Sequence, residues 1–454
     1  MATEELAPCA TMLAAALLLC NKLANTKNVS SARVESLLRM IARSLLLLVA
    51  LAVPASASTF YVATDGDDSN RGTLEEPFGT IQRAQEFVSP GDTVFIRGGT
   101  YRMRESQIAR TRRIFAHVID LHKSGSKGSR IKYWAYKYEK PKFDFSDVKP
   151  SGKRVHAFAI GGSWIHIKGI EVVGVQVTVS GHTQSICIAN DGSHNVFEHL
   201  SMHDGMAIGF YGVGGSDNLI LNCDAFRNHD SFSENGRGGN TDGFGYHPTR
   251  GGKNNVFRGC RAWLNSDDGF DCINASESIT FENCWAMDNG YSADRKSLAD
   301  GNGFKAGGYG SKTKRQLPRT IPRHVVKDCI AAYNKSSGFY ANHHVGGCDW
   351  LNNLAYRNGT NFNMLCRTND NSTDVPGYGH VLKGNVSLAS RRLIINVNLA
   401  KCELADNRFD PDEPFPDFDI QSLDRSQLTG PRQADGSLPK IAIRPSGAST
   451  LKFP

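Results

Sequence analysis

Four aspartates and one lysine in the middle of the chain share a fixed spacing from successive Gly-Phe pairs. Asp242 and Asp268 each lie two residues before a Phe, Asp267 lies three before, and Asp271 and Lys305 each lie one after. If the Phe residues occupy equivalent positions in adjacent coils, residues at equal offsets are neighbours, and Asp271 points outward where Phe270 points inward. Clustered carboxylates repel one another unless a cation lies among them, and oxygen-only ligands at a turn favour Ca²⁺. The spacing therefore predicts a Ca²⁺ site made by the four aspartates.

Lys305 is expected beside this cluster, one strand beyond Asp271 on the same outer face. A neutral lysine amine next to Ca²⁺ suits removal of the C5 proton of a uronic acid, because the cation stabilises the charge that forms. The bond from C4 to the glycosidic oxygen then breaks, which is a β-elimination that consumes no water. A free lysine is mostly protonated at neutral pH, so this role needs a lowered pKa or an alkaline pH. The alternative is that the aspartates only shape Asp-Gly turns.

A basic segment surrounds the lysine. Residues 294–323 contain eight Lys or Arg and two Asp. An anionic polymer lying along the outer face would meet this charge, so we expect Lys312, Lys314 and Arg315 to bind substrate. The alternative is a solvated loop. Nucleic acid is not expected as a partner, because no aromatic stacking platform or known motif accompanies the charge.

Internal repeats predict the elements that position these residues. Four segments alternate apolar and polar residues, as strands do, and end in Cys223, Cys260, Cys284 and Cys329. Gly-Phe pairs recur along the same region at intervals of 26 to 35 residues, and Asn361-Phe362 extends the series after 23 residues. Short strands with recurring turn residues predict an all-β fold, a parallel β-helix whose coils stack about 4.8 Å apart. A β-sandwich is the alternative fold, but its turns would not recur in matched columns.

Stacking of the coils assigns roles to the repeated Cys and Asn residues. The four cysteines form a buried column of free thiols, with paired disulfides as the alternative. An asparagine follows each of these cysteines by five residues, and a further copy extends the series, which predicts a hydrogen-bonded column at a corner. The members of this column are Asn228, Asn265, Asn289, Asn334 and Asn358.

Residues 1–57 have the composition of a leader. Arg39 and Arg43 precede the apolar run 45–53, and Ala55-Ser56-Ala57 fits the small-x-small rule for cleavage of a secretion signal. We predict cleavage after Ala57, with Met40 as an alternative start, and a secreted protein in the extracellular space or periplasm. Neither apolar run reaches the ~18 residues needed to span a bilayer, so no membrane partner is expected after cleavage.

Residues 58–454 are predicted to form one β-helix catalytic domain, which we expect to be monomeric. The open ends of a β-helix need covers, because unpaired strand edges aggregate. A helical apolar pattern predicts an N-terminal capping helix at about 79–90, and we expect a tail at about 407–454 to wrap the far end.

Composition excludes several other classes. Apolar residues make up 40% of the chain and charged residues of both signs 21%, which argues against disorder. The glycines follow no period of three, so the chain is not collagen-like, and frequent Gly, Asn and Asp disfavour a coiled coil. A formal net charge of +7 tolerates an acidic partner. Nine of the eleven cysteines follow the predicted cleavage site, and an odd number argues against a full disulfide framework.

Three motifs give the chain a resemblance to a known family. Asn240-Thr-Asp-Gly-Phe, Asn265-Ser-Asp-Asp-Gly-Phe-Asp and Gly301-Asn-Gly-Phe-Lys-Ala-Gly-Gly occur in this order. The chain thereby resembles polysaccharide lyase family 9, secreted right-handed parallel β-helix enzymes best known as pectate lyases. Segments within 60–101 and at 431–439 are also similar to that family, so the resemblance covers about residues 59–440.

The resemblance implies roles for five residues and a substrate class. All five positions match, so that Asp242, Asp267, Asp268 and Asp271 are implied as Ca²⁺ ligands and Lys305 as the catalytic base. The implied substrate is an anionic pectic polysaccharide. Polygalacturonate is the first expectation and rhamnogalacturonan I the alternative within the family.

Two other function classes fit part of the pattern. β-Helix polygalacturonases also carry Asn-Thr-Asp and Asp-Asp motifs, in which case Asp242, Asp267 and Asp268 would be acid and base of a hydrolase. Such enzymes also need a downstream Gly-His-Gly and Arg-Ile-Lys, whereas this sequence has no Gly-His-Gly and its Arg130-Ile-Lys132 lies upstream. A non-catalytic carbohydrate-binding β-helix is the other class. An unsaturated, ultraviolet-absorbing product would identify a lyase.

Overall fold

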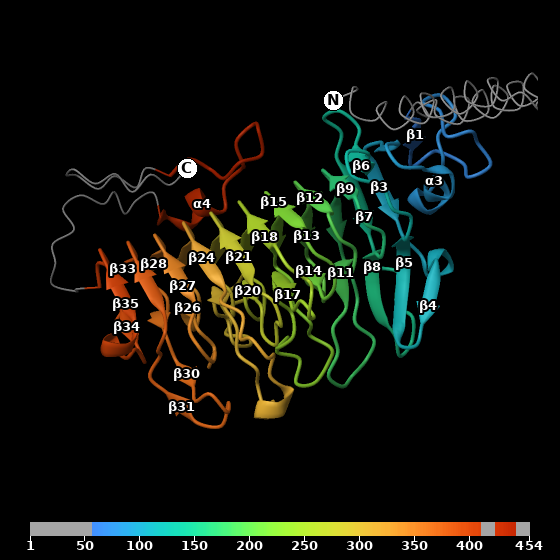
Figure 1. Ribbon diagram of the computed structural model, residues 1–454. Coiled ribbons are helices and arrows are strands. Elements are labelled where there is room, and N and C mark those ends of the chain that lie inside the picture. Colours follow the sequence, from blue (N-terminus) through green and yellow to red (C-terminus); the bar gives the residue numbers. More distant parts are fainter. Residues whose placement is uncertain (1–56, 410–422, 442–454) are drawn as a thin grey trace, which may run out of the picture. The chain divides into compact units, whose positions relative to one another are not determined.

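The computed structural model describes residues 57–409 and 423–441, so the predicted secretion signal lies outside the described residues. Successive short strands wind through three sheets, here called A, B and C, in that repeating order (Figure 1). Neighbouring strands along the three sheets are parallel, except where β4 pairs with β5. Three parallel sheets joined in rotation form a β-helix, as predicted.

Sheet A has twelve strands, sheet B ten and sheet C eleven. Sheet A comprises β1 Thr59–Val62, β2 Thr93–Ile96, β6 Ile131–Ala135, β9 Ile165–Lys168, β12 Val196–Glu198, β15 Leu219–Leu221, β18 Asn255–Arg258, β21 Ile279–Glu282, β24 Val325–Lys327, β27 Asp349–Leu351, β32 Val381–Lys383 and β35 Glu403–Ala405. Sheet B comprises β3 Gly99–Arg102, β7 Pro141–Asp144, β10 Glu171–Val173, β13 Ser201–His203, β16 Asp224–Phe226, β19 Arg261–Trp263, β22 Trp285–Met287, β25 Ile330–Ala332, β28 Leu354–Tyr356 and β33 Val386–Leu388. Sheet C comprises β4 Arg110–Arg112, β5 Phe115–Leu121, β8 Arg154–Ile160, β11 Ile186–Asn190, β14 Ile208–Gly212, β17 Phe244–Tyr246, β20 Phe270–Asp271, β23 Phe304–Lys305, β26 Ser337–Tyr340, β29 Thr360–Asn363 and β34 Ile394–Ile395.

The remaining elements lie outside these sheets. They are the hairpin of β30 Cys366–Arg367 and β31 Asp374–Val375, the helices α3 Ile81–Phe87 and α4 Arg425–Leu428, and the 3₁₀ turns η1 Glu105–Gln107, η2 Lys314–Gln316 and η3 Leu399–Lys401.

Four corners between sheets A and B turn at a residue in the left-handed conformation. Asn222 (φ 52°), Gly259 (φ 65°), Asn283 (φ 50°) and Asp328 (φ 56°) hold this position, each directly before one of the four repeated cysteines. Gly, Asn and Asp adopt this region more readily than other residues, which explains the recurring residue types before Cys. The turn directs the cysteine side chains inward.

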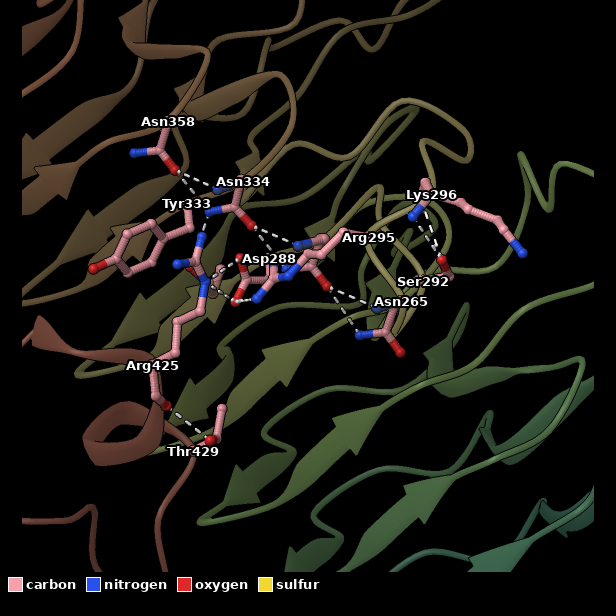
Figure 2. Close-up of polar contacts among 12 residues, drawn as sticks. Asn265, Asp288, Ser292, Arg295, Lys296, Tyr333, Asn334, Asn358, Arg425 and Thr429 are labelled. Atoms are coloured by element: carbon pink, nitrogen blue, oxygen red, sulfur yellow. Dashed lines mark hydrogen bonds and ion pairs between the residues drawn. The ribbon is translucent and has the colours of Figure 1, made fainter.

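The cysteine and asparagine columns are confirmed. All nine described cysteines are free. Eight of them are buried, among them Cys223, Cys260, Cys284 and Cys329, and Cys402 is partly buried. The asparagine side chains form a ladder in which each amide donates to the next carbonyl oxygen at 2.9–3.1 Å. Figure 2 shows part of this ladder at Asn265, Asn334 and Asn358. Buried amides are thereby satisfied from coil to coil, which fixes the stacking register.

The Gly-Phe pairs form the inner column of sheet C. Phe210, Phe244, Phe270, Phe304 and Phe339 are register partners on successive strands and are fully buried. From Phe244 onward, neighbouring rings stack with centroids 4.7–5.2 Å apart. The preceding glycines leave room, because a Cβ on Gly269 would lie 2.7 Å from the Gly303 carbonyl oxygen. This column sets the strand register that places the residues next to each Phe.

Helix α3 covers the first coil, as expected for the N-terminal cap. Thr80 begins the helix, and its hydroxyl oxygen accepts a hydrogen bond from the Arg83 amide. Ile81 and Ala84 are buried in the core. The side chain of Gln82 accepts from the Asp120 amide at 2.9 Å, which pairs the helix with the edge of β5.

The described part of the C-terminal tail differs from the expectation. We predicted that it wraps the far end of the β-helix, but residues 423–441 pack on the outer face of sheet B. Leu423, Leu428 and Leu438 join a second apolar cluster with Trp285 and other residues of that face. Arg425 pairs with Asp288 at 3.0 Å (Figure 2). The physical reason is that both faces of these sheet B strands carry apolar side chains, so the outer one also needs a cover.

A carboxylate and lysine cluster on sheet C

The predicted site residues meet on the outer face of sheet C, in the register inferred from the Phe spacing. Lys305 of β23 is the register partner of Asp271 of β20, and Asp271 is the partner of Gly245 of β17. Asp242 and Asp268 lie just before β17 and β20, respectively. The first column lies two residues before each Phe and the second lies one residue after it. Together they bring residues from three coils to one place.

Three of the four aspartates form a compact group. Oxygen atoms of Asp242, Asp268 and Asp271 all lie within 4.8 Å of one another. Each of the three residues is at most 5% exposed. Backbone amides hold all three carboxylates. The Asp268 amide donates to Oδ1 of Asp242 at 3.1 Å, the Ile273 amide to Oδ1 of Asp271 at 2.6 Å, and the Asn302 amide to Oδ1 of Asp268 at 2.7 Å.

Asp267 lies beside this group. Its Oδ1 accepts a hydrogen bond from the Asp300 amide at 3.1 Å, and the residue is buried. Adjacent residues of an extended chain point in different directions, so Asp267 and Asp268 do not present their carboxylates identically. The structure therefore brings three of the predicted ligands together directly, while the role of Asp267 as a ligand stays a prediction.

Lys305 supplies a positive charge next to the cluster. Its Nζ lies 2.9 Å from Oδ2 of Asp268 and 3.2 Å from Oδ2 of Asp271. Burial alone would lower the pKa of Lys305, but the surrounding carboxylates, Asp268 foremost, raise this pKa well above its usual range. The amine is therefore protonated while the carboxylates are charged and no other cation offsets them.

The charge of the group fits a hard cation. Burial and then the charge of Asp267 raise the pKa of Asp242 well above its usual range, and burial also raises the pKa of Asp268. Oδ2 of Asp268 is buried and, beyond its ion pair with Lys305, accepts no hydrogen bond from the described residues. Three neighbouring carboxylates, with no nitrogen or sulfur ligand in the group, form the donor set that Ca²⁺ prefers.

Asn302 is a member of the site that sequence reasoning missed. Its backbone amide and side-chain amide both donate to Oδ1 of Asp268, at 2.7 and 2.8 Å. Its own Oδ1 accepts from the Ser337 amide at 3.0 Å. The signal was present, because Asn302 lies two residues before Phe304, as Asp268 lies before Phe270.

The basic segment divides into paired and unpaired residues. Arg295 and Arg323 form ion pairs with Asp288 and Asp349, which assigns them to structure. Lys314 and Arg315 lie exposed in η2, and Lys312 is partly exposed. The side chain of Asn371, in the β30–β31 hairpin, holds this loop by donating to the Lys312 carbonyl at 2.7 Å. No carboxylate among the described residues pairs with Lys312, Lys314 or Arg315, and their contact with substrate stays a prediction.

Comparison with known proteins shows the class to which this fold and site belong. The chain matches the family described as the Pel9A-like, right-handed β-helix region over residues 60–373. It is 33% identical to pectate lyase L of Dickeya dadantii (strain 3937) over 390 residues, which cover 85% of this chain and 82% of the relative. It is 28% identical to pectate lyase PEL9 of Emericella nidulans, over 90% of this chain and 96% of the relative.

Two solved structures extend the comparison. A rhamnogalacturonan lyase is 44% identical with a TM-score of 0.81, covering 85% of this chain and 96% of that one. Pectate lyase Pel9A is 29% identical with a TM-score of 0.65, covering 88% and 91%. The protein is therefore a right-handed parallel β-helix polysaccharide lyase. It belongs to the Pel9A-like β-helix family, as the resemblance implied.

Among residues 57–409 and 423–441, no helix combines the length and apolar character that crossing a bilayer requires.

Proposed function

We propose that this lyase cleaves an acidic pectic polysaccharide by Ca²⁺-dependent β-elimination at a galacturonate residue, with Lys305 as the base. The observation that carries the proposal is the position of the Lys305 amine, 2.9 and 3.2 Å from two carboxylates of a buried acidic group. A uronate bound at a cation among these carboxylates would lie within reach of this amine.

The residues divide the chemistry between them. Asp242, Asp268 and Asp271, with Asp267 beside them, would hold Ca²⁺, which supplies positive charge that stabilises the uronate carboxylate as negative charge builds up on it. Lys305 takes the C5 proton at Nζ, the C5–H electrons form the C4–C5 double bond, and the C4–O bond breaks with its electrons going to the leaving oxygen, which is then protonated. The aspartate charges keep Lys305 protonated, so its action as a base requires those charges to be offset.

The geometry disfavours the hydrolase alternative. Inverting glycoside hydrolases separate their two carboxyl groups by about 6.5–9.5 Å to admit a water molecule. Here the oxygens of Asp242 and Asp268 lie within 4.8 Å of each other. An ammonium group also fills the space beside Asp268. For Asp242 and Asp268 this spacing is shorter than an inverting hydrolase uses, which supports elimination.

Rhamnogalacturonan is the substrate we favour. The identity of 44% to a rhamnogalacturonan lyase exceeds the 33% and 29% to the pectate lyases compared above. This reverses the order expected from the sequence motifs, which put polygalacturonate first. Polygalacturonate stays the second candidate because several curated relatives are named pectate lyases. Both polymers are extracellular, and we propose that the enzyme is secreted to reach them, by the signal predicted in residues 1–57.

One assay tests the proposal. Purified enzyme with Ca²⁺ is incubated separately with rhamnogalacturonan and with polygalacturonate, and the ultraviolet absorbance of the unsaturated product is followed. We expect absorbance to rise on rhamnogalacturonan and to stop on chelation of the metal. New reducing ends without absorbance would contradict elimination, and activity confined to polygalacturonate would overturn the substrate choice. Binding of either polymer without any cleavage would support the non-catalytic alternative instead.

A further inference from the structure

A cavity lies on the outer face of sheet C, on the N-terminal side of the carboxylate cluster. It has a volume of about 450 Å³ and is walled by β4, β5, β8, β11 and β14. Figure 1 shows these strands, in cyan to green, next to β17 and β20 of the same sheet, to which β23 also belongs. The cavity is therefore on the face along which a polymer bound at the cluster would continue.

Strand register connects the cavity with the cluster. Tyr211 lines the cavity, and its register column continues through Gly245 and Asp271 to Lys305. Three strand spacings of ~4.8 Å place Tyr211 about 14 Å from Lys305 along the sheet. Gly245 lacks a side chain there, and a Cβ on it would lie 2.8 Å from the Tyr211 ring. The Tyr211 ring thus lies next to Gly245, between the cavity and the cluster on the same face of sheet C.

Three arginines give the cavity a positive wall. Arg112 and Arg113 lie exposed at the end of the β4–β5 hairpin, and Arg154 begins β8. Among the described residues, no carboxylate forms an ion pair with any of them. By contrast, Arg110 in the same hairpin donates from Nε and Nη2 to the two carboxylate oxygens of Asp120. The one acidic residue in the cavity lining is Asp191.

The floor of the cavity carries two histidines without hydrogen bonds. Neither the His117 nor the His156 ring pairs with any described residue, and one nitrogen of each ring is buried. Burial lowers the pKa of His117 and lowers that of His156 to about 3, so both rings are neutral near neutral pH. The other nitrogen of each ring also has no partner among the described residues, so a hydroxyl of a ligand in the cavity can hydrogen-bond to it. The Phe115 ring lies 4.9 Å from the His156 ring and adds an aromatic surface.

We propose that this cavity is a remote subsite of the polysaccharide groove, which binds a galacturonate unit several residues from the bond that is cleaved. The guanidinium groups of Arg112, Arg113 and Arg154 bind the sugar carboxylate, because arginine matches a carboxylate with paired hydrogen bonds. The histidines and Phe115 face the hydroxyls and the ring surface. The subsite rests on the function proposed above, since it assumes that an acidic polymer occupies the groove.

The test compares long and short substrates. A triple variant, Arg112→Ala with Arg113→Ala and Arg154→Ala, is set against a matched control, Arg71→Ala with Arg102→Ala and Arg104→Ala, which removes three exposed arginines outside the groove. We expect kcat/KM on long rhamnogalacturonan oligosaccharides to fall about tenfold or more in the triple variant, since charged hydrogen bonds are lost. The shortest cleavable oligosaccharides should be unaffected, because they do not reach the cavity.

Calorimetric titration separates failure of the subsite from failure of the proposed function. Long and short rhamnogalacturonan and polygalacturonate oligosaccharides are titrated into both triple variants in a Lys305→Ala background, so that binding is read without turnover. Weaker binding of long oligosaccharides confined to the groove variant supports the subsite, even if no polymer is cleaved. Equal losses in both triple variants would assign the effect to net charge and overturn it. Unchanged binding, or equal loss on long and short oligosaccharides, would also overturn it.

Discussion

Lys305 and Asp271 are register partners on adjacent strands of sheet C, and the Lys305 Nζ atom lies 3.2 Å from Oδ2 of Asp271. The same amine lies 2.9 Å from Asp268. Lysine is thus the counter-ion of the carboxylates to which a metal would bind, so a cation and the ammonium group compete for the same oxygens. This competition links metal binding to the protonation state of Lys305. The role of Lys305 as the base and the role of the aspartates as metal ligands can be tested by separate mutations.

Lys305→Ala should abolish the unsaturated product while leaving the fold intact, because the side chain lies on the outer face and its loss opens no core cavity. Removal of a general base costs roughly 10²–10⁴ in rate. Lys305→Arg should not restore activity, since a guanidinium stays protonated. Lys327→Ala is the control, because that lysine pairs with Glu282 on sheet A, away from the groove. Initial rates at saturating Ca²⁺ decide the matter, and a variant that keeps more than about a tenth of the rate would exclude Lys305 as the base.

Asp268→Asn should remove Ca²⁺ binding and activity together, because a buried ligand oxygen becomes an amide. Saturating Ca²⁺ should stabilise the wild type by about 2.7 kcal/mol at a hundred times its Kd. The shift in thermal unfolding on adding Ca²⁺ should disappear in Asp268→Asn and persist in Asp217→Asn, an exposed control. Full activity of the wild type in a chelator would contradict a metal requirement, since no other strong electrophile is present in these motifs.

Asn302→Ala should weaken Ca²⁺ binding without removing any ligand. Asp268 would lose the side-chain hydrogen bond of 2.8 Å that orients its Oδ1, although the backbone hydrogen bond from residue 302 remains. Loss of such a supporting contact typically costs about 10–100-fold in metal affinity. Asn240→Ala is the matched control, because its amide contacts Glu234 rather than the cluster. Calcium titration followed by calorimetry would show the difference, and equal affinities in the two variants would mean that Asn302 only supports the backbone.

Much of this site was predictable because a β-helix converts sequence spacing into position. Counting from each Phe placed Asp271 beside Lys305 correctly, since stacked strands keep one register. The count does not extend to the tail, because residues 423–441 carry no repeat and their place depends on which outer face is apolar. The ion pair of Arg295 with Asp288 could not be predicted either, because it joins a loop to a corner and the repeat spacing does not relate these two positions. Register rules thus predict columns, whereas contacts made by insertions depend on the folded surface.

Replacement of Lys312, Lys314 and Arg315 together by Ala should weaken binding of an anionic oligosaccharide, and the loss should be larger at low salt. Exposed charges act over about 10 Å at 0.1 M salt, so screening hides their contribution at higher salt. Lys296→Ala is a control from the same segment, because this exposed lysine pairs with Asp294 at 2.7 Å. Titration into the Lys305→Ala background over a salt series measures the effect. Identical affinities of the triple variant and its parent at every salt concentration would show that these three side chains are solvated and do not bind substrate.

Acid should destabilise the fold in part through His344. This residue is fully buried, its Nδ1 accepts from the Gly308 amide at 3.1 Å, and its Nε2 donates to the Pro322 carbonyl at 2.8 Å. Burial lowers its pKa to about 4, whereas an unfolded histidine titrates near ~6.5. As pH falls between these values, the unfolded chain gains a proton that the folded protein does not, so the free energy of unfolding falls.

The slope is about 1.4 kcal/mol per pH unit for one such group, and this contribution is fully present above pH ~6.5. His344→Gln keeps one acceptor and one donor but does not titrate, so its stability should fall less steeply toward acid than that of the wild type. Urea unfolding of both proteins across this range, at saturating Ca²⁺, gives the two slopes. His122→Gln is the control, since this exposed histidine leaves the core unchanged. Parallel slopes for His344→Gln and the wild type would show that His344 does not carry the acid sensitivity.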